Sequence, residues 1–238
     1  MSATIDVPID TLKDTTVKAL VAIGHTQADA EVVADTILFA EIRANNQGLI
    51  KLVAGALKPS PNAIDFIRRH YDLEKTKFNI GVAWKGGSAG TASVYRTLDL
   101  QTLAHCFSEQ PIKLYSLQYK ENKADLAEFN ATNAYPINPF LEQELDDLDH
   151  LAALIDQLDL VLTVQNTNVH LSGAIGKKCI ALLPYAPEWR YGMEGTSMVW
   201  YQSVHLVRQS RLGQWDDVIT NARGLIDQAV AAWKGSGV

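Results

Sequence analysis

The sequence predicts an α/β fold, in which a parallel β-sheet carries helices on both faces and is preceded by a separate helical segment. Three observations support this prediction. Beyond Lys75, short strand-like segments alternate with helix-like segments. The strand-like segments are apolar along their whole length, as strands are when both faces of a sheet are covered. Before that point the pattern is helical throughout, and Pro59 and Pro61 interrupt it.

The N-terminal segment shows the signals of helices. Thr26 followed by Asp29 is typical of a helix start with an acidic residue at the third helical position. Apolar residues then recur on one helical face, and residues 45–48 supply a stop. Shorter helices are expected over residues 49–57 and 63–71. We place the domain boundary at the two prolines, which gives a helical segment of residues 1–62 and a main domain of residues 63–238. The apolar positions of the first long helix are Ala30, Val33, Ile37, Ala40 and Ala44.

The main domain is expected to contain five strands and four further helices. The strands are predicted at residues 78–84, 112–117, 160–164, 179–183 and 204–207. The helices are predicted at residues 98–107, 148–158, 169–175 and 215–233. This alternation is the pattern of consecutive β–α–β units.

Composition narrows the class of protein. The chain has 238 residues, of which 47 % are hydrophobic and 20 % charged, as in a folded globular protein. Its apolar runs are shorter than the ~20 residues that span a bilayer, and residues 1–6 lack a signal-peptide pattern. Cys106 and Cys179 have no CxxC partner, which favours reduced, buried thiols. We therefore expect a cytoplasmic protein without a membrane span.

The charge is unevenly distributed. The net charge is −6, which argues against nucleic acid as a partner. Residues 121–159 contain ten acidic residues and one Lys, a balance of −9, so the remainder of the chain carries +3. A mildly basic remainder could hold a phosphate-bearing small molecule, although solvated surface charge is the commoner cause. The acidic group in this stretch lacks a metal-binding pattern and is interpreted as a solvated helix start. Its members are Glu142, Glu144, Asp146, Asp147 and Asp149.

Two loops stand where ligands bind in parallel α/β sheets, beyond the carboxyl ends of strands. The first contains Lys85, Gly86 and Gly87, whose glycines would let backbone N–H groups approach an anion while Lys85 adds charge. Its spacing is that of neither a P-loop nor a dinucleotide fingerprint, and a plain turn is the alternative.

The second loop joins a predicted strand to a short helix and contains Asn166, Thr167, Asn168 and His170. Amide and hydroxyl groups at a helix N-terminus bind phosphate well. The alternatives are that Asn166 or Thr167 only caps the helix, and that His170 is a core histidine. Both interpretations are compatible with the spacing.

Other candidates carry less information. Lys120 follows the second predicted strand and could reach a phosphate. Trp189, Arg190 and the Trp200–Tyr201 pair lie in a glycine-containing region and suit either base stacking or packing. The chain has no GxSxG, HExxH or zinc-ligand spacing, so no catalytic residue, metal or cofactor is assigned.

Several blocks, in one order, resemble the C-terminal domain of bacterial glycosyltransferases that often carry tetratricopeptide repeats. More distantly, they are similar to heptosyltransferases and O-GlcNAc transferase. The resemblance covers residues 78–226. It implies a Rossmann-like sheet that forms one half of a GT-B architecture and holds a nucleotide sugar. The blocks are residues 80–87, 114–118, 158–176, 183–191, 200–201 and 206–209.

By this resemblance, the loops at 85–87 and 166–170 would face the diphosphate and sugar, and Trp189 and Arg190 would line or support the nucleotide pocket. Gln165 stands where related transferases often have an acidic residue, which leaves the identity of the donor open. A GT-B enzyme also needs a second α/β domain for the acceptor, and the first seventy residues do not provide one.

Residues 5–63 instead resemble the N-terminal helices of the malate/L-lactate/ureidoglycolate dehydrogenase family, through residues 28–35 and 43–48. Gln47 takes the place of a histidine proposed for proton transfer in many members, and the nicotinamide-binding part of that family is missing. A truncated NAD(P)-dependent enzyme is therefore disfavoured.

The sequence accordingly predicts a glycosyltransferase-like protein that binds a nucleotide sugar or nucleoside diphosphate. The alternative is a non-catalytic nucleotide-binding or protein-interaction module. In either case the N-terminal helices would be available for contact with a second copy or a partner protein.

Overall fold

A computed structural model of the protein describes residues 7–22, 24–42, 58–71, 73–86, 93–108, 110–119, 123–140 and 147–235. Three helices come first: α1 (Ile9–Ala22), α2 (Gln27–Ile42) and α3 (Pro61–His70). The strands are β1 (Phe78–Ala83), β2 (Ile112–Ser116), β3 (Ile137–Asn138), β4 (Leu160–Val164), β5 (Cys179–Leu183), β6 (Ser197–Met198) and β7 (Tyr201–Arg208). Between and after them lie η3 (Ser93–Arg96), α4 (Leu100–Ala104), α5 (Lys123–Thr132), α7 (Leu148–Gln157), α8 (Thr167–Ala174), η4 (Trp189–Tyr191) and α9 (Asp216–Gly235).

The strands form one sheet in the order β3-β2-β1-β4-β5-β7-β6. Neighbouring strands from β3 to β7 run parallel, whereas the edge strand β6 is antiparallel to β7. The predicted mainly parallel α/β sheet is confirmed, with an antiparallel edge strand that the pattern did not indicate.

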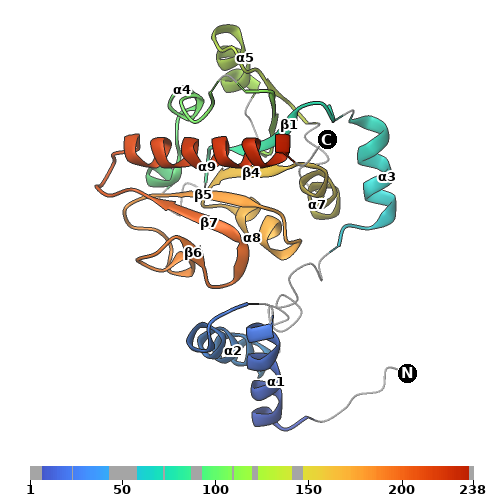
Figure 1. Ribbon diagram of the computed structural model, residues 1–238, viewed down its shortest axis with the longest axis vertical. Helices are drawn as coiled ribbons and strands as arrows, with labels where there is room; N and C mark the ends of the chain where they lie inside the picture. Colours follow the sequence, from blue (N-terminus) through green and yellow to red (C-terminus); the bar gives the residue numbers. More distant parts are fainter. Residues whose placement is uncertain are drawn as a thin grey trace.

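Helices cover both faces of this sheet, with α9 crossing one face in Figure 1. Side chains of β4 show how the strands serve both layers: Leu160 and Leu162 join the cluster formed with α4, α5 and α9, while Val161 joins that formed with α3, α7 and α8. All five residues of β4 are buried. A strand buried on both faces has to be apolar throughout, which is why the alternation predicted the architecture.

Several predicted boundaries were wrong. The helix expected at 98–107 is confined to α4. It begins after Asp99, because the Asp99 side chain caps it by accepting a hydrogen bond from the Thr102 N–H (2.8 Å). Leu98 and Phe107 are buried outside the helix, so their hydrophobicity extended the apparent pattern. The helix expected from 169 begins at Thr167, and the strand expected at 204–207 is the longer β7.

Two strands and one α-helix were not predicted, and neither were the 3-10 helices η3 and η4. Strands β3 and β6 have two residues each, too few for a periodic signal. Helix α5 buries Leu126 and Phe129, but its sequence shows little amphipathic periodicity, so the pattern did not indicate a helix. The predicted stop at 45–48, with Gln47, and the predicted helix at 49–57 lie outside the described residues.

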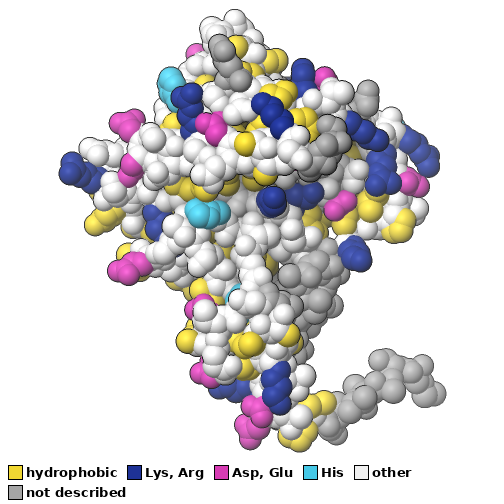
Figure 2. Space-filling view, viewed as in Figure 1, with side chains coloured by type: hydrophobic (Ala, Val, Ile, Leu, Met, Phe, Trp, Pro, Cys, Tyr) yellow, Lys and Arg dark blue, Asp and Glu magenta, His cyan; other side chains and the backbone are white. Residues whose placement is uncertain are grey.

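Helices α1 and α2 form a hairpin with a small core of its own. The predicted start of α2 is confirmed: the Asp29 N–H donates to Thr26 Oγ1 (3.2 Å), and the Thr26 hydroxyl donates to Asp29 Oδ2 (2.9 Å). The hairpin forms the narrow lower end of the molecule in Figures 1 and 2. The buried residues of this core are Val17, Leu20, Ala30, Val33, Ala34 and Ile37.

The hairpin contacts the sheet domain near the start of β7. Trp200 packs against the hairpin core. Gly24, at φ +101°, lies so close to Gln202 that a Cβ at position 24 would come within 2.7 Å of Gln202 Nε2. Gly24 therefore allows both a left-handed turn and a close approach.

Helix α3, in contrast, packs on α7 within the sheet domain. The Ser60 N–H donates to Asp149 Oδ1 (2.8 Å), and the rings of Phe66 and His150 stack with centroids 4.8 Å apart. Ser60 also caps α3 by accepting from the Ala63 N–H (3.1 Å). Ser60 and α3 therefore pack with the sheet domain, although the predicted boundary assigned Ser60 to the helical segment.

We expect the domain to fold without the hairpin. A chain that begins at Lys58 retains the Ser60 cap and the α3–α7 contacts, and should unfold in one cooperative transition in a circular-dichroism melt. A molten or insoluble product, with the full chain folded, would show that the hairpin and the sheet share one cooperative core.

Close packing of α8 on β7 gives a second expectation. A Cβ on Gly173 would lie 2.2 Å from Tyr201 Cγ, so Gly173→Ala should lower the free energy of unfolding by about 1–3 kcal/mol. Gly224→Ala in α9 is the matched control: a Cβ there meets nothing within 4 Å, and the higher helix propensity of Ala should add up to about 1 kcal/mol. Chemical denaturation of both variants tests this, and equal effects would contradict it.

Candidate functional site

The candidate site lies at the carboxyl edge of the sheet, where the strand order reverses. From β1 the chain adds β2 and then β3 toward one edge of the sheet. From β4 it adds β5 and then β7 toward the opposite edge. Strands β1 and β4 are neighbours, with Ala83 opposite Thr163. The loops that follow them diverge, and such a switch point is where open α/β sheets bind ligands.

Buried glutamines fix the loops at this edge. Gln118, after β2, accepts hydrogen bonds through Oε1 from the N–H groups of Trp84 (3.1 Å) and Lys85 (2.8 Å). Gln165, after β4, accepts from the Glu188 N–H (3.1 Å). In each case the amide oxygen of a glutamine at one strand end accepts hydrogen bonds from backbone N–H groups of a neighbouring loop. These N–H groups therefore have acceptors although the loops have no regular secondary structure.

The first predicted loop packs directly against the second. A Cβ on Gly86 would lie 2.6 Å from the Gln165 carbonyl oxygen and 3.2 Å from that of Arg96. The structure gives Gly86 a steric role that the sequence did not indicate, because three backbone segments meet at this point. Gly87 and Lys120 lie outside the described residues.

The second loop begins α8 with a side-chain cap. Asn166 Oδ1 accepts from the Asn168 N–H (2.9 Å) and from the Thr163 hydroxyl (3.0 Å). The buried Asn168 amide donates to the Leu117 carbonyl oxygen (3.1 Å) and so ties α8 to the end of β2. Of the alternatives left open by the sequence, Asn166 is the helix cap, whereas Thr167 is exposed at the first helical position.

His170, on α8, lies in an aromatic cluster with Tyr191 of η4 and Tyr201 of β7. Its Nε2 is 3.4 Å from the Tyr191 hydroxyl, and its ring centroid is 5.8 Å from that of Tyr191 and 6.0 Å from that of Tyr201. Burial raises the pKa of Tyr191, which keeps its hydroxyl protonated. His170 is half-buried, so it is neither a fully buried core residue nor a fully exposed side chain.

Charged side chains form two separate groups at this edge. Lys85 pairs with Asp125 of α5, which also accepts a hydrogen bond from Trp84 Nε1 (3.4 Å). On the other side, Glu188 pairs with both Arg96 and Arg190. The predicted cations Lys85 and Arg190 thus have carboxylate partners on opposite sides of the switch point.

A pocket of about 720 Å³ adjoins the first group. It lies between the end of β1, the start of α4, and α5. Lys85 lines it together with three acidic residues, Asp99, Asp125 and Glu128. This lining has an excess of negative charge, which suits hydroxyl or amine groups of a ligand better than its phosphates.

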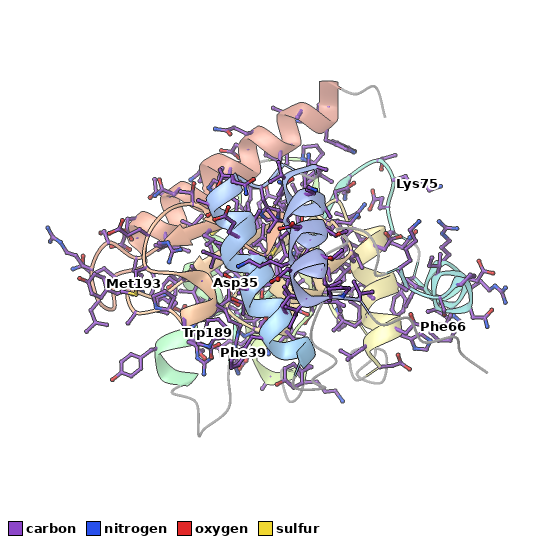
Figure 3. All side chains as sticks on the ribbon, turned by 90° about the horizontal axis from the view of Figure 1, so that it is seen from below. Asp35, Phe39, Phe66, Lys75, Trp189 and Met193 are labelled. Atoms are coloured by element: carbon purple, nitrogen blue, oxygen red, sulfur yellow. The ribbon has the colours of Figure 1, made fainter. Side chains whose placement is uncertain are left out.

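Trp189 and Arg190 lie on the loop after β5. Trp189 is 70 % exposed, and it is labelled in the view of Figure 3. The Arg190 guanidinium carbon lies 5.6 Å from the centroid of the Trp189 ring, and the Arg190 carbonyl accepts from Trp200 Nε1 (2.9 Å). An exposed indole beside a cation can stack on a base or a sugar.

The described residues offer little other chemistry. Both cysteines are buried, and burial raises the pKa of each thiol to about 12, which keeps the thiols protonated. No group of three or more His, Cys, Asp or Glu side chains in the described ranges is placed to hold a metal ion. No helix in this part of the chain is long and apolar enough to cross a membrane.

The sequence did not identify Arg96 and Glu188 as site residues. Arg96 lies at the end of η3 and Glu188 immediately before η4, outside the glycine-rich and strand-adjacent motifs. Arg96 had only its charge as a sequence signal, whereas Glu188 lies within the block of residues 183–191 that carries the resemblance. Only the fold brings these two positions together.

No family model matches the chain, and no curated protein sequence matches it. Two solved structures have a similar fold. ADP-heptose LPS heptosyltransferase II of E. coli matches with a TM-score of 0.54 and 12 % identity, over 75 % of this chain and 54 % of that chain. A family 9 glycosyl transferase from Veillonella parvula matches with a TM-score of 0.54 and 14 % identity, over 84 % and 59 %.

The chain thus spans between half and three fifths of these two structures. At such identities the likeness shows the fold. It supports the predicted GT-B-like half, whereas the predicted likeness of the N-terminal helices to dehydrogenases finds no support in these matches. The chain has a glycosyltransferase-like α/β fold.

Proposed function

We propose that this chain binds a nucleoside diphosphate or nucleotide sugar and acts as the donor half of a glycosyltransferase. The observation that carries the proposal is the convergence of the Gly86 loop and the start of α8 at the switch point between β1 and β4. The two structural neighbours are glycosyltransferases, which supports the same assignment.

The chemistry of this edge suits a diphosphate. The first turn of α8 contributes its positive end, and the exposed Thr167 hydroxyl stands at the first helical position. During transfer an acceptor oxygen would bond to the anomeric carbon as the bond to the diphosphate breaks. Hydrogen-bond donors at the diphosphate would stabilise the charge that develops on this leaving group.

We assign the donor side of the reaction to the described residues and leave the acceptor base unassigned. His170 contacts the Tyr191 hydroxyl and lies on α8, where the proposal makes it a donor-side residue rather than a base. The α1–α2 hairpin is proposed to contact a partner protein or a second copy of the chain. Val32 on α2 is 62 % exposed and is available for such a contact.

A calorimetric screen of UDP-, GDP-, CMP- and ADP-sugars, with the matching nucleoside diphosphates, tests the proposal. Saturable binding of one class is expected. If none binds at millimolar concentration, the donor assignment fails and a protein-interaction module becomes the better description.

Thr167→Ala should weaken the affinity for the bound nucleotide by roughly tenfold or more, because a hydrogen bond to a charged phosphate contributes about 1.5–3 kcal/mol. The melting temperature should change little, since Asn166 rather than Thr167 caps α8. Calorimetric titration and thermal melts measure both quantities.

Two controls accompany this variant. Asn166→Ala should lower the stability by about 1 kcal/mol through loss of the cap. Thr15→Ala, at an exposed threonine of α1 that bonds within its own helix, should leave the affinity unchanged, and the higher helix propensity of Ala should change the stability by less than about 1 kcal/mol. Loss of stability without loss of affinity in Thr167→Ala would make this hydroxyl structural.

The Lys85–Asp125 pair gives a charge test of the same site. Lys85→Ala should weaken nucleotide binding, and Asp125→Asn should strengthen it, because removing the carboxylate leaves the ammonium group uncompensated. Both effects should shrink as salt rises. Asp14→Asn on α1 is the remote control, and identical titrations for all four proteins would place Lys85 outside the site.

A further inference from the structure

Arg96 is unusual among the charged residues. Within the described ranges it is the one buried residue of the Lys, Arg, Asp and Glu types, with 8 % of its surface exposed. A guanidinium group cannot lose its proton, so burying it requires hydrogen-bond acceptors and a counter-charge. Its surroundings therefore show where this edge of the sheet accommodates an anion.

Glu188 supplies that counter-charge and shares it with a second arginine. Glu188 Oε1 accepts from Arg96 Nη1, and Glu188 Oε2 accepts from Arg190 Nη2. The three side chains of this trio, Arg96, Glu188 and Arg190, carry two positive charges and one negative charge. The side chains of Glu188 and Arg190 are 31 % and 42 % exposed, which leaves this side of the trio open to solvent.

The position of the trio matters more than its charge. Arg96 belongs to the segment after β1, and Glu188 to the loop after β5. Strand β4 lies between these two strands, and α8 follows it. The Arg96–Glu188 contact therefore joins the two loops on either side of the end of β4, next to the start of α8.

The backbone at this point is held firmly. Gln165, at the end of β4, accepts the Glu188 N–H, and the Arg96 carbonyl oxygen lies against Gly86. The loops are thus fixed by their main chains, whereas the Glu188 carboxylate is held by its contacts with the two guanidinium groups.

We propose that Arg96 and Arg190 form an anion subsite, and that Glu188 is an internal ligand which a phosphate group displaces. Carboxylate and phosphate oxygens both accept paired hydrogen bonds from guanidinium groups, so one can replace the other. A diphosphate carries more negative charge than Glu188 and can accept hydrogen bonds from both guanidinium groups, as Glu188 does. The inference rests on the proposed function for its ligand, the diphosphate of a nucleotide.

The test uses the full chain and inorganic pyrophosphate as the probe. Glu188→Gln removes the competing charge but keeps the size of the side chain. At low ionic strength it should bind pyrophosphate roughly tenfold more tightly than the parent protein, measured by calorimetric titration. Without an anion its melting temperature should fall, because Arg96 loses its counter-charge, and pyrophosphate should restore it.

Glu194→Gln is the matched control. Glu194 is an exposed carboxylate six residues further along the same stretch, and its removal changes the net charge equally. It should leave the affinity for pyrophosphate within about twofold of the parent, since an exposed charge at a distance is largely screened. If Glu188→Gln binds no more tightly than Glu194→Gln, Glu188 is a structural ion-pair partner and the inference is wrong.

A second pair of variants covers the case in which Glu188→Gln does not fold. Arg190→Gln changes a half-exposed side chain. This variant should bind pyrophosphate roughly tenfold more weakly than the parent protein. Arg211→Gln, at an exposed arginine after β7, should not. Equal affinities of these two variants would also overturn the subsite.

The outcomes separate the inference from the proposed function. If a nucleotide binds to the parent with an affinity that neither Glu188→Gln nor Arg190→Gln changes, the donor function stands and the subsite fails. If Glu188→Gln gains pyrophosphate affinity while no nucleotide binds, the subsite stands and the donor function fails.

Discussion

The carboxyl edge of the sheet depends on amide side chains that replace regular backbone hydrogen bonding. Gln118, Gln165 and Gln209 are all buried, and each follows a strand. Gln209 repeats the arrangement of the other two, since its Oε1 accepts from the N–H groups of Tyr185 (3.0 Å) and Gly213 (3.2 Å). A buried backbone N–H without an acceptor costs free energy, so these bonds allow irregular loops to pack closely over the strand ends.

This constraint determines what the edge can do. Because the loop backbones are fixed, Gly86 can lie against two carbonyl oxygens, and α8 can begin immediately after β4. The charged side chains above this framework are less buried, with the exception of Arg96. The loop backbones thus form a fixed base beneath less buried ion pairs, which is the arrangement that the proposed anion site requires.

The two charge groups divide the edge into regions of different chemistry. On the β2 side, Lys85 faces acidic residues that also line the large pocket. On the β5 side, two arginines share one carboxylate. A nucleotide sugar, the proposed ligand, has a base and a polar ribose at one end and a charged diphosphate in the middle, so it would need neighbouring regions of this kind. The two charge groups together therefore support the proposed nucleotide site better than either group does alone.

The hairpin illustrates how a small helical unit is added to such a domain. Its own core consists of short apolar side chains, and it reaches the sheet domain through Trp200 and the close approach of Gly24 to Gln202. The contact is made at the start of β7, whereas the ion pairs lie beyond the ends of β1 and β5. Pro61 is the first residue of α3, and this helix packs on α7. We therefore infer that the boundary between the hairpin and the α/β domain lies before α3.

The sequence by itself determined the type and order of the main elements, because strands covered on both faces must be apolar and helices need caps. The fully apolar β4 and the Thr26–Asp29 start of α2 are local signals of this kind. It also indicated the loops at Gly86 and Asn166, since both directly follow predicted strands. Whether Asn166 or Thr167 capped α8 could not be read from spacing, because both residue types are good caps.

Tertiary structure alone decided which distant residues meet. Arg96 and Glu188 are 92 positions apart, and their contact depends on the order β1-β4-β5, which brings the loops of two non-consecutive strands together across a third. The partner of Lys85 likewise comes from α5, a helix whose sequence shows little amphipathic pattern. Hydrophobic periodicity reports the burial of each segment, whereas charge pairing depends on strand order, which periodicity does not encode.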